Sequence, residues 1–413
     1  MSKMTVTDLK GLKGKVVFVR VDFNVPLKNG MIEDDNRIVA ALPTIKYLKE
    51  QEARVVLFSH LGKVDHKDPE KCAANKAKND MKFVAPRLAE LLNEEVVYVP
   101  ETRGETLTNA IHSLKDGQVL LMQNTRYEKG ESKNDADLAS YWASLADAFV
   151  MDAFGSAHRA HSSTYGVPEI LNSQGKPTAL GFLMQKEVDG LNRCVNITDE
   201  DRPFVAILGG AKVSDKILVV EKLIEKADKV LIGGAITCTF LKALGKPVGT
   251  SRYEADQLDF ALKCVELAKA KNKLVLPIDH IVADDFAMPL DVRVTTGVEI
   301  AEGFERLDIG PRTRNYYNEI LQNAKTVFWN GPMGVFENPL FAEGTKAICE
   351  TLTKLTREKG AFTVIGGGDS ASAASQMGYK EGFSHVSTGG GASLELIQNE
   401  GHLPGIDVIA DKK

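Results

Sequence analysis

Cysteine is scarce in this sequence, and long apolar runs are missing from it. The 413 residues include only five cysteines, which are widely spaced and show neither a C-x-x-C pair nor the spacing of a metal site. This usage argues against a disulfide framework and is typical of a reducing compartment. No stretch approaches the roughly 20 apolar residues of a membrane span, and the first residues lack the apolar core of a signal peptide. We therefore expect a soluble cytoplasmic protein.

A basic surplus and the familiar nucleotide signatures are also absent. The net charge is -5, with both signs interspersed along the chain, so neither nucleic acid nor an acidic membrane is an expected partner. The sequence contains no G-x-x-x-x-G-K-[ST] motif, no G-x-G-x-x-G after a first strand, and no H-R-D or D-F-G. If the protein binds phosphates, it uses neither a P-loop, nor a Rossmann fingerprint, nor a protein-kinase core.

The chain has enough apolar residues for two cores. Hydrophobic residues make up 43% of it, and its length exceeds what one core usually supports. Apolar runs followed by turns alternate with helical patterns, which is typical of βαβ units. We predict an α/β fold with two doubly wound, Rossmann-like parallel sheets joined by a helical hinge. The amphipathic segment 181–196 marks the boundary, which we place between domains 1–184 and 185–399.

Glycine is abundant at the ends of apolar runs in the second half. Two triplets, Gly366–Gly368 and Gly389–Gly391, each follow a predicted strand and open a predicted helix. Bare backbone amides at a helix start, with the positive end of the helix dipole, form an anion site, and two such turns indicate a ligand with several phosphates. Alternatively, each turn simply closes a tight connection. Further glycine turns follow apolar runs at 209–210, 233–234 and 331–334, which favours one nucleotide site built from many loops.

Two lysines follow the first of these glycine pairs. Lys212 and Lys216 are spaced by one helical turn, which predicts that they share a face at a helix start. Like charges there are mildly unfavourable unless an anion lies between them. The alternative is that both are ordinary solvated lysines.

In the first half, the apolar runs end in charged and hydrogen-bonding residues instead. Because parallel strands end at one edge of a sheet, these residues are expected to converge on a small polyanion. Arginine suits this role because its planar fork pairs with carboxylate or phosphate through two hydrogen bonds. Taken singly, each arginine is more often an ordinary surface or interface ion pair, and His60 is explained by a loop histidine with satisfied hydrogen bonds. The set comprises Arg37, His60, Lys63, Arg126, His158 and Arg159.

The order of these motifs resembles that of phosphoglycerate kinases over nearly the full length. The resemblance rests on R-V-D-F-N-V-P at 20–26, S-H-L-G at 59–62, N-T-R-Y at 124–127, A-H-R-A-H-S-S at 157–163, L-G-G-A-K-V at 208–213, W-N-G-P-M-G-V-F-E at 329–337 and both glycine triplets. It implies the glycolytic reaction ATP + 3-phosphoglycerate ⇌ ADP + 1,3-bisphosphoglycerate, by direct in-line transfer on hinge-bending closure of a cleft. It also implies a monomer, with the tail 400–413 packed back on the first domain.

The resemblance further implies a role for each matching position. The acid would be bound in the first domain by Asp22, Phe23, Asn24, Arg37, His60, Leu61, Gly62, Lys63, Arg126 and Arg159. The nucleotide would be bound in the second by Gly210, Lys216, Gly233, Asn330, Glu337, Gly366, Gly367, Gly368, Asp369 and Ser370. Asp369 would also bind Mg²⁺, as a hard oxygen ligand. Arg37 and Lys212 would stabilise charge on the transferring group, to which Gly389, Gly390 and Gly391 present a helix N-terminus.

The sequence departs from the family pattern at two places. Lys63-Val64 stands where the family usually has arginine and proline, which keeps the charge but loses the fork and is expected to alter affinity for the acid. The stretch 65–80 is rich in lysine, aspartate and alanine and predicts an exposed excursion before a helix over 81–92. Two other functions compete with the kinase: a dehydrogenase, disfavoured by the missing fingerprint, and a binding or scaffold protein that kept the fold without the chemistry.

Overall fold

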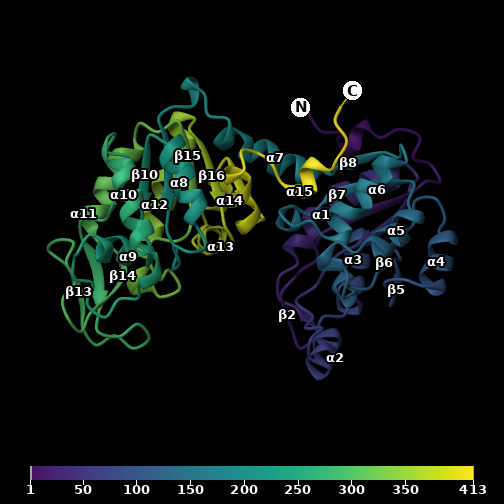
Figure 1. Ribbon diagram of the computed structural model, residues 1–413, viewed down its shortest axis with the longest axis horizontal. Helices are drawn as coiled ribbons and strands as arrows, with labels where there is room; N and C mark the ends of the chain where they lie inside the picture. The colour runs from purple at the N-terminus through teal and green to yellow at the C-terminus, as the bar shows by residue number, and fades with distance from the viewer. Residues whose placement is uncertain (1, 413) are drawn as a thin grey trace. The chain divides into compact units, whose positions relative to one another are not determined.

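The computed structural model describes residues 2–412 and divides into two compact units (Figure 1). Unit 1 comprises Met1–Val188 and His402–Lys413, and unit 2 comprises Asp189–Gly401. The division falls within helix α7 (Phe182–Val195), which occupies the segment where the sequence predicts a helix. The chain therefore passes from one unit to the other twice, once within α7 and once just after Gly401.

The core of unit 1 is a six-stranded parallel sheet in the order β5-β6-β4-β1-β7-β8. Because all six strands run the same way, their carboxyl ends lie at one edge. A small antiparallel hairpin of β2 and β3 stands outside this sheet. The strands are β1 (Val16–Val21), β2 (Leu27–Lys28), β3 (Met31–Ile32), β4 (Arg54–Phe58), β5 (Val97–Val99), β6 (Val119–Met122), β7 (Ala148–Asp152) and β8 (Thr178–Leu180).

Both faces of this sheet are covered, which is why its strands read as continuous apolar runs. On one face Val17 and Val19 pack in a cluster with Ile45 of α1. On the other, the Phe58 ring makes edge-on contacts with Phe18 and Trp142, with centroids 5.4 Å apart in both pairs. The helices of this unit are α1 (Asn36–Glu50), α2 (Pro69–Lys78), α3 (Ala85–Leu92), α4 (Glu105–His112), α5 (Ala136–Ser144), α6 (Val167–Ser173) and α15 (Pro404–Asp407).

The structure differs from the sequence prediction both in the excursion 65–80 and in the helix that follows it. The stretch 65–80 is exposed, as expected, but it contains the ten-residue helix α2, capped by the Asp68 carboxylate, which accepts hydrogen bonds from the amides of Glu70 and Lys71. The predicted helix over 81–92 is split into a 3-10 turn at Met81–Phe83 and the shorter α3. Pro86 lies in the first turn of α3, which fits the break, since proline is favoured at a helix start and disfavoured in a helix interior.

The core of unit 2 is a second six-stranded parallel sheet, in the order β11-β10-β9-β15-β16-β17. A separate antiparallel sheet, ordered β13-β12-β14, was not predicted from the sequence. The strands are β9 (Phe204–Leu208), β10 (Lys229–Ile232), β11 (Leu274–Val275), β12 (His280–Ala283), β13 (Val292–Val294), β14 (Glu305–Ile309), β15 (Thr326–Asn330), β16 (Phe362–Gly366) and β17 (His385–Ser387).

Helices flank this sheet too. Ile207 and Trp329 of the sheet pack in one cluster with Leu321 of α11 and Leu352 of α12, while α8 packs against α10 and α14. The helices are α8 (Ile217–Lys226), α9 (Ile236–Ala243), α10 (Leu258–Lys269), α11 (Pro311–Leu321), α12 (Glu343–Lys359), α13 (Gly368–Gln376) and α14 (Gly390–Gln398). The predicted α/β class with two parallel-sheet domains is confirmed. Across residues 2–412, no helix has both the length and the apolar character needed to cross a bilayer.

Candidate active site

The loops after β1, β4 and β6 of unit 1 are joined by hydrogen bonds at the carboxyl edge of the sheet. The amide of Gly62 donates to the Asn24 side-chain oxygen at 2.7 Å. The amide of Phe23 donates to Ser59 Oγ at 2.9 Å, and that of Leu61 donates to Asn124 Oδ1 at 3.1 Å. The predicted acid-binding positions on these three loops therefore lie together, although they are far apart in the sequence.

Two arginines extend into this group from different elements. Arg37 lies in the first turn of α1, not in a strand-end loop as expected, and its Nη1 is 3.0 Å from the Asp22 carboxylate. Arg126 donates from Nη1 to the Gly62 carbonyl at 2.6 Å and is half-buried, and this burial lowers the pKa of its guanidinium. The Arg37 side chain is 39% exposed, so it is accessible to a ligand while Asp22 orients it.

The remaining predicted cations differ in their settings. Arg159 and Lys63 are exposed, and among the residues described the Lys63 side chain has no ion pair. The Lys63 carbonyl accepts a hydrogen bond from Asn79 Nδ2 at 2.9 Å. His158 is half-buried, and burial followed by the nearby Arg159 charge lowers its pKa, so it contributes no positive charge at neutral pH.

His60 is buried and neutral. Burial lowers its pKa well below the usual value, and the charges of Arg20, Arg126 and Arg37 lower it further. Arg20 Nη2 lies 3.1 Å from His60 Nδ1. Since arginine can only donate, Nδ1 must accept, which leaves the proton on Nε2. The imidazole is therefore held as a neutral hydrogen-bond donor.

Arg20 is the main residue that the sequence reading missed in unit 1. Its side chain is 1% exposed, donates from Nε to Ser163 Oγ at 2.8 Å, and donates from Nη1 to the Val21 carbonyl at 2.6 Å. Glu131, also buried, accepts from the Ser163 amide at 2.8 Å and brings a negative charge near Arg20. An arginine inside an apolar strand was the available signal, because buried charges are rare unless they are paired.

In unit 2, the loops after β9, β10 and β15 form one backbone junction. The amides of Gly210 and Gly234 donate to the carbonyls of Pro332 and Met333 at 3.0 and 2.9 Å. A Cβ on Gly209 would lie 2.2 Å from the Pro332 carbonyl oxygen, and one on Gly234 would lie 2.2 Å from the Gly210 amide nitrogen. Close backbone packing therefore explains these glycine pairs, and it brings Gly210, Gly233 and Asn330 together.

The two glycine triplets lie next to each other. The first contains the end of β16 and the start of α13, and the second begins α14. A Cβ on Gly390 would lie 3.3 Å from the Gly368 amide nitrogen, so the amino termini of the two helices adjoin. Ser370 Oγ accepts from the Gly331 amide at 2.6 Å, and Asn330 Nδ2 donates to the Gly366 carbonyl. These contacts link the triplets to the glycine junction.

Lys212 and Lys216 do not share a helical face, so that prediction is wrong. Helix α8 begins only at Ile217, and both lysines precede it. The Glu254 carboxylate accepts hydrogen bonds from the amides of Val213 and Ser214 and holds the segment as a loop. Lys212 is exposed, whereas Lys216 donates to the Gly209 carbonyl, and burial lowers its pKa to about 8 despite the charges of Asp369 and Asp215.

Two predicted carboxylates are exposed at these loops. Asp369 lies in the first turn of α13, and Glu337 follows the β15 loop. Among the residues described, no group of three or more His, Cys, Asp or Glu side chains could hold a metal ion. A lone carboxylate at a phosphate-binding turn still suits Mg²⁺, which usually keeps several waters and binds through one or two carboxylates and substrate phosphates.

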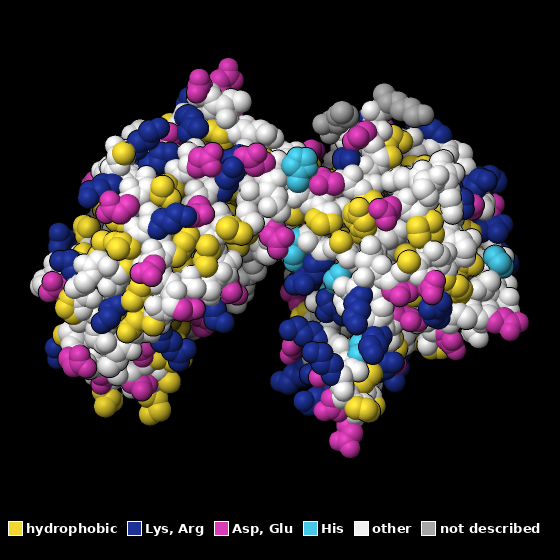
Figure 2. Space-filling model, in the orientation of Figure 1, with side chains coloured by type: hydrophobic (Ala, Val, Ile, Leu, Met, Phe, Trp, Pro, Cys, Tyr) yellow, Lys and Arg dark blue, Asp and Glu magenta, His cyan; other side chains and the backbone are white. Residues whose placement is uncertain are grey.

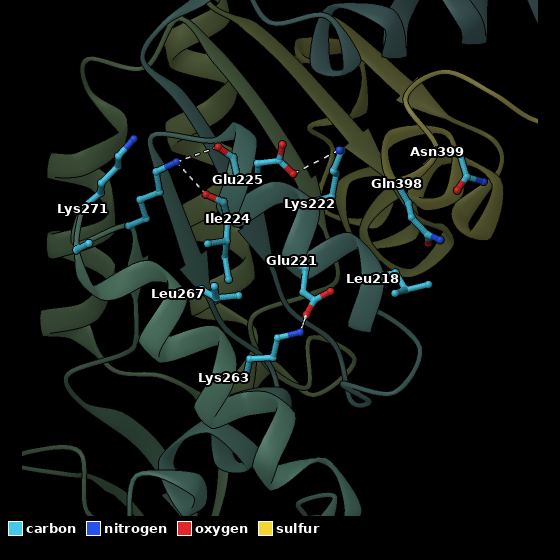
Figure 3. Close-up of a pocket in the computed structure, with 12 residues that line it drawn as sticks. Leu218, Glu221, Lys222, Ile224, Glu225, Lys263, Leu267, Lys271, Gln398 and Asn399 are labelled. Atoms are coloured by element: carbon cyan, nitrogen blue, oxygen red, sulfur yellow. Dashed lines mark hydrogen bonds and ion pairs between the residues drawn. The ribbon is translucent and has the colours of Figure 1, made fainter.

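A hollow of about 760 Å³ in unit 2 lies elsewhere, among α8, α10 and the end of α14 (Figure 3). Its charged side chains are largely engaged with one another. Lys263 is 2.5 Å from Glu221, and Lys273 donates to the carbonyls of Ile224 and Glu225 at 2.8 and 3.0 Å. It includes none of the predicted site residues, and we assign it no part in the chemistry.

These features define a two-domain α/β protein that carries cations at the strand ends of one unit and glycine turns at helix starts in the other. The family model for phosphoglycerate kinase matches residues 6–400. The chain is 53% identical over 416 residues to phosphoglycerate kinase of Enterococcus faecalis and 51% identical over 414 residues to that of Fusobacterium nucleatum, covering at least 99% of each sequence in both pairs. The solved structure of phosphoglycerate kinase from Coxiella burnetii matches with a TM-score of 0.84 at 38% identity, covering 98% of each chain.

The chain belongs to the phosphoglycerate kinase family. The predicted resemblance is thereby confirmed, and the dehydrogenase alternative is excluded. The reaction of this family is the glycolytic transfer of a phosphoryl group between ATP and 3-phosphoglycerate, with Mg-ATP as the nucleotide.

Proposed function

We propose that unit 1 binds 3-phosphoglycerate, that unit 2 binds Mg-ATP, and that the phosphoryl group passes directly between them. The observation that carries this proposal is the separation of two chemistries. Cations and hydrogen-bond donors gather at the strand ends of one sheet, whereas backbone amides at helix starts gather at those of the other. A direct transfer needs positioning and charge stabilisation, and no nucleophile from the protein.

The acid would be bound by the cations and donors of unit 1. Arg37, Arg126, Arg159 and Lys63 supply positive charge for its carboxylate and phosphate. His60, held by Arg20, has its Nε2–H free to donate. The rest of the predicted acid-binding set, namely Asp22, Phe23, Asn24, Leu61 and Gly62, would shape the site through the hydrogen bonds that join its loops.

The nucleotide would be bound by the loops of unit 2. The amides of Gly366–Gly368 face its phosphates, with Ser370 beside them and Asp369 positioned to bind Mg²⁺. A bound Mg²⁺ ion would supply neutralisation of phosphate charge. Lys216 adds a cation held among the glycine loops. Gly210, Gly233, Asn330 and Glu337 would complete the site.

Arg37 and Lys212 would stabilise the charge that develops on the transferring phosphoryl group, with Gly389–Gly391 presenting the start of α14 to it. Because the two substrates bind to different units, transfer requires the units to approach. We infer closure about α7 and the return of the chain after Gly401, the two places where it passes between units.

We further infer that the enzyme acts as a monomer in the cytoplasm. All five cysteines are present as free thiols, and four of them are buried, which fits a reducing compartment. Light scattering of the purified protein tests the monomer directly.

A coupled assay of nucleotide-dependent phosphorylation of 3-phosphoglycerate tests the proposed function. We expect turnover that requires Mg²⁺. Zero turnover by a folded protein with Mg-ATP would overturn the proposal in favour of the scaffold alternative, which keeps the fold and the binding loops without the chemistry.

A further inference from the structure

Helix α2, within the excursion 65–80, adds nothing to the core of unit 1. None of its ten residues is buried, and its only apolar side chains are small. Without an apolar stripe, tertiary packing cannot stabilise it in the usual way. The helix is instead stabilised by its Asp68 cap and by hydrogen bonds to neighbouring loops, so packing does not explain its presence.

The neighbouring loops are those after β4 and β6, which carry residues proposed above to bind 3-phosphoglycerate. Asn124 Nδ2 donates to the Asn79 carbonyl at 2.9 Å, and Asn79 Nδ2 donates to the Lys63 carbonyl at 2.9 Å. His66 Nε2 is 2.8 Å from the Arg126 carbonyl oxygen, and the Tyr127 hydroxyl donates to the carbonyl of Lys76. The excursion is therefore fixed to both the β4 and the β6 loops, directly beside Lys63 and Arg126.

The excursion exposes mainly positive charge. Residues 63–82 contain six lysines and four carboxylates, within a chain whose net charge is -5. The Asp65, Asp68 and Asp80 carboxylates are turned to backbone amides, at 2.9 Å from Lys67, 3.0 Å from Glu70 and 2.8 Å from Lys82. Figure 2 shows the resulting gathering of Lys and Arg side chains over α2 and the loops beside it.

Most of these ammonium groups have no carboxylate partner within residues 2–412. Among the residues described, only Lys71 and Lys82 of the six form ion pairs, with Asp68 at 3.7 Å and Asp80 at 3.9 Å. Lys76 lies over the Tyr127 ring at 5.3 Å. Unpaired cations beside an anion site raise the local concentration of an anionic ligand and speed its encounter, an effect that salt removes.

We propose that α2 and its flanking lysines form an entry surface that accelerates association of 3-phosphoglycerate with unit 1. The surface acts before contact, through the field of Lys67, Lys76 and Lys78, and it supplements the charge of Lys63 at the site itself. This inference rests on the proposed function of unit 1 as the acid site.

The test compares two triple variants with equal changes in net charge. One is Lys67→Gln/Lys76→Gln/Lys78→Gln, in which glutamine keeps helix propensity and all hydrogen bonds from the backbone. The control is Lys263→Gln/Lys269→Gln/Lys271→Gln, three exposed lysines at and just beyond α10 in unit 2. Calorimetry with 3-phosphoglycerate gives Kd, phosphorus NMR line shapes give koff, and their ratio gives kon, all with the full chain and without nucleotide.

We expect kon of the α2 variant to fall about threefold to tenfold at low salt, at or below the roughly tenfold lower end of what steering supplies, because part of the positive charge remains, with koff nearly unchanged. The difference should vanish near 0.5 M salt, where screening acts within about 4 Å. An unchanged kon, an equal fall in the control, or a fall that persists at high salt would overturn the entry surface. Failure of the wild type to bind 3-phosphoglycerate would overturn the acid site as well, whereas normal binding with unchanged kon overturns the entry surface alone.

Discussion

Replacing Arg37 with alanine should separate catalysis from stability. Arg37 pairs with Asp22 at 3.0 Å, and the two side chains are 39% and 13% exposed. A partly exposed pair of this kind contributes about 0–1 kcal/mol to folding. Loss of one group that stabilises a transferring phosphoryl group costs on the order of 10²–10³ in turnover, or about 2.7–4 kcal/mol. The catalytic loss should therefore exceed the loss of stability severalfold.

A matched control lies in the same unit. Arg54 pairs with Asp116 at 3.1 Å, with 33% and 35% exposure, but it begins β4 and so lies at the end of that strand opposite the candidate site. Arg54→Ala should cost the same small amount of stability and leave turnover unchanged. The paired comparison removes any general effect of losing an exposed arginine.

The measurements are the coupled assay at saturating substrates and urea denaturation of both variants. Turnover of Arg37→Ala within about threefold of wild type would refute the proposed role of Arg37, since loss of a group that stabilises developing charge lowers turnover far more than that. A similar fall in turnover for Arg54→Ala would show that the fall in Arg37→Ala comes from a general effect on charge or folding. A loss of stability well above 1 kcal/mol in Arg37→Ala alone would show that the Asp22 pair is mainly structural.

The remaining predictions concern single residues and the motion between units. Asp369→Ala should weaken Mg-nucleotide binding in calorimetry and leave 3-phosphoglycerate affinity nearly intact, and unchanged turnover at limiting Mg²⁺ would contradict its role. Lys63→Ala should weaken acid binding by about 1 kcal/mol while Lys63→Arg equals or exceeds wild type; an alanine variant that binds normally would mean that the side chain points elsewhere. The His60 ring should show no NMR titration near pH 6.5, because burial and then Arg20 lower its pKa, and a midpoint there would contradict the neutral tautomer. X-ray scattering should show compaction with both substrates bound, and an unchanged radius of gyration in an active ternary complex would refute closure.

Strands and turns were predictable because local pattern determines them. Apolar runs such as 16–19 and 327–329 lie between two helical layers, so they contain few polar residues and stand out in the sequence. Helix α2 was missed for the opposite reason. It has a capping aspartate and a proline in its first turn but no apolar periodicity, and periodicity is the main sequence signal for a helix.

The errors within the site have non-local causes. The loop at 212–216 looked like a helix start, but Glu254, about 40 residues further on, accepts its amides. The role of Arg20 depends on Ser163 and His60, which only the folded sheet brings to it. The sequence thus allows us to predict which residues gather at the strand ends. It does not allow us to predict the hydrogen-bond partner of each side chain.

The glycines illustrate how structure separates two explanations that the sequence left open. Gly209 and Gly234 have backbone atoms within 2.2 Å of where a Cβ would lie, so packing between loops is sufficient reason for them. Gly368 has nothing within 4 Å, so neighbouring atoms do not require glycine there. Its missing side chain instead leaves the first amides of α13 open, beside those of α14. Under the proposed function, the two triplets are the turns whose amides would bind the phosphates, whereas packing between loops explains the glycine pairs at 209–210 and 233–234.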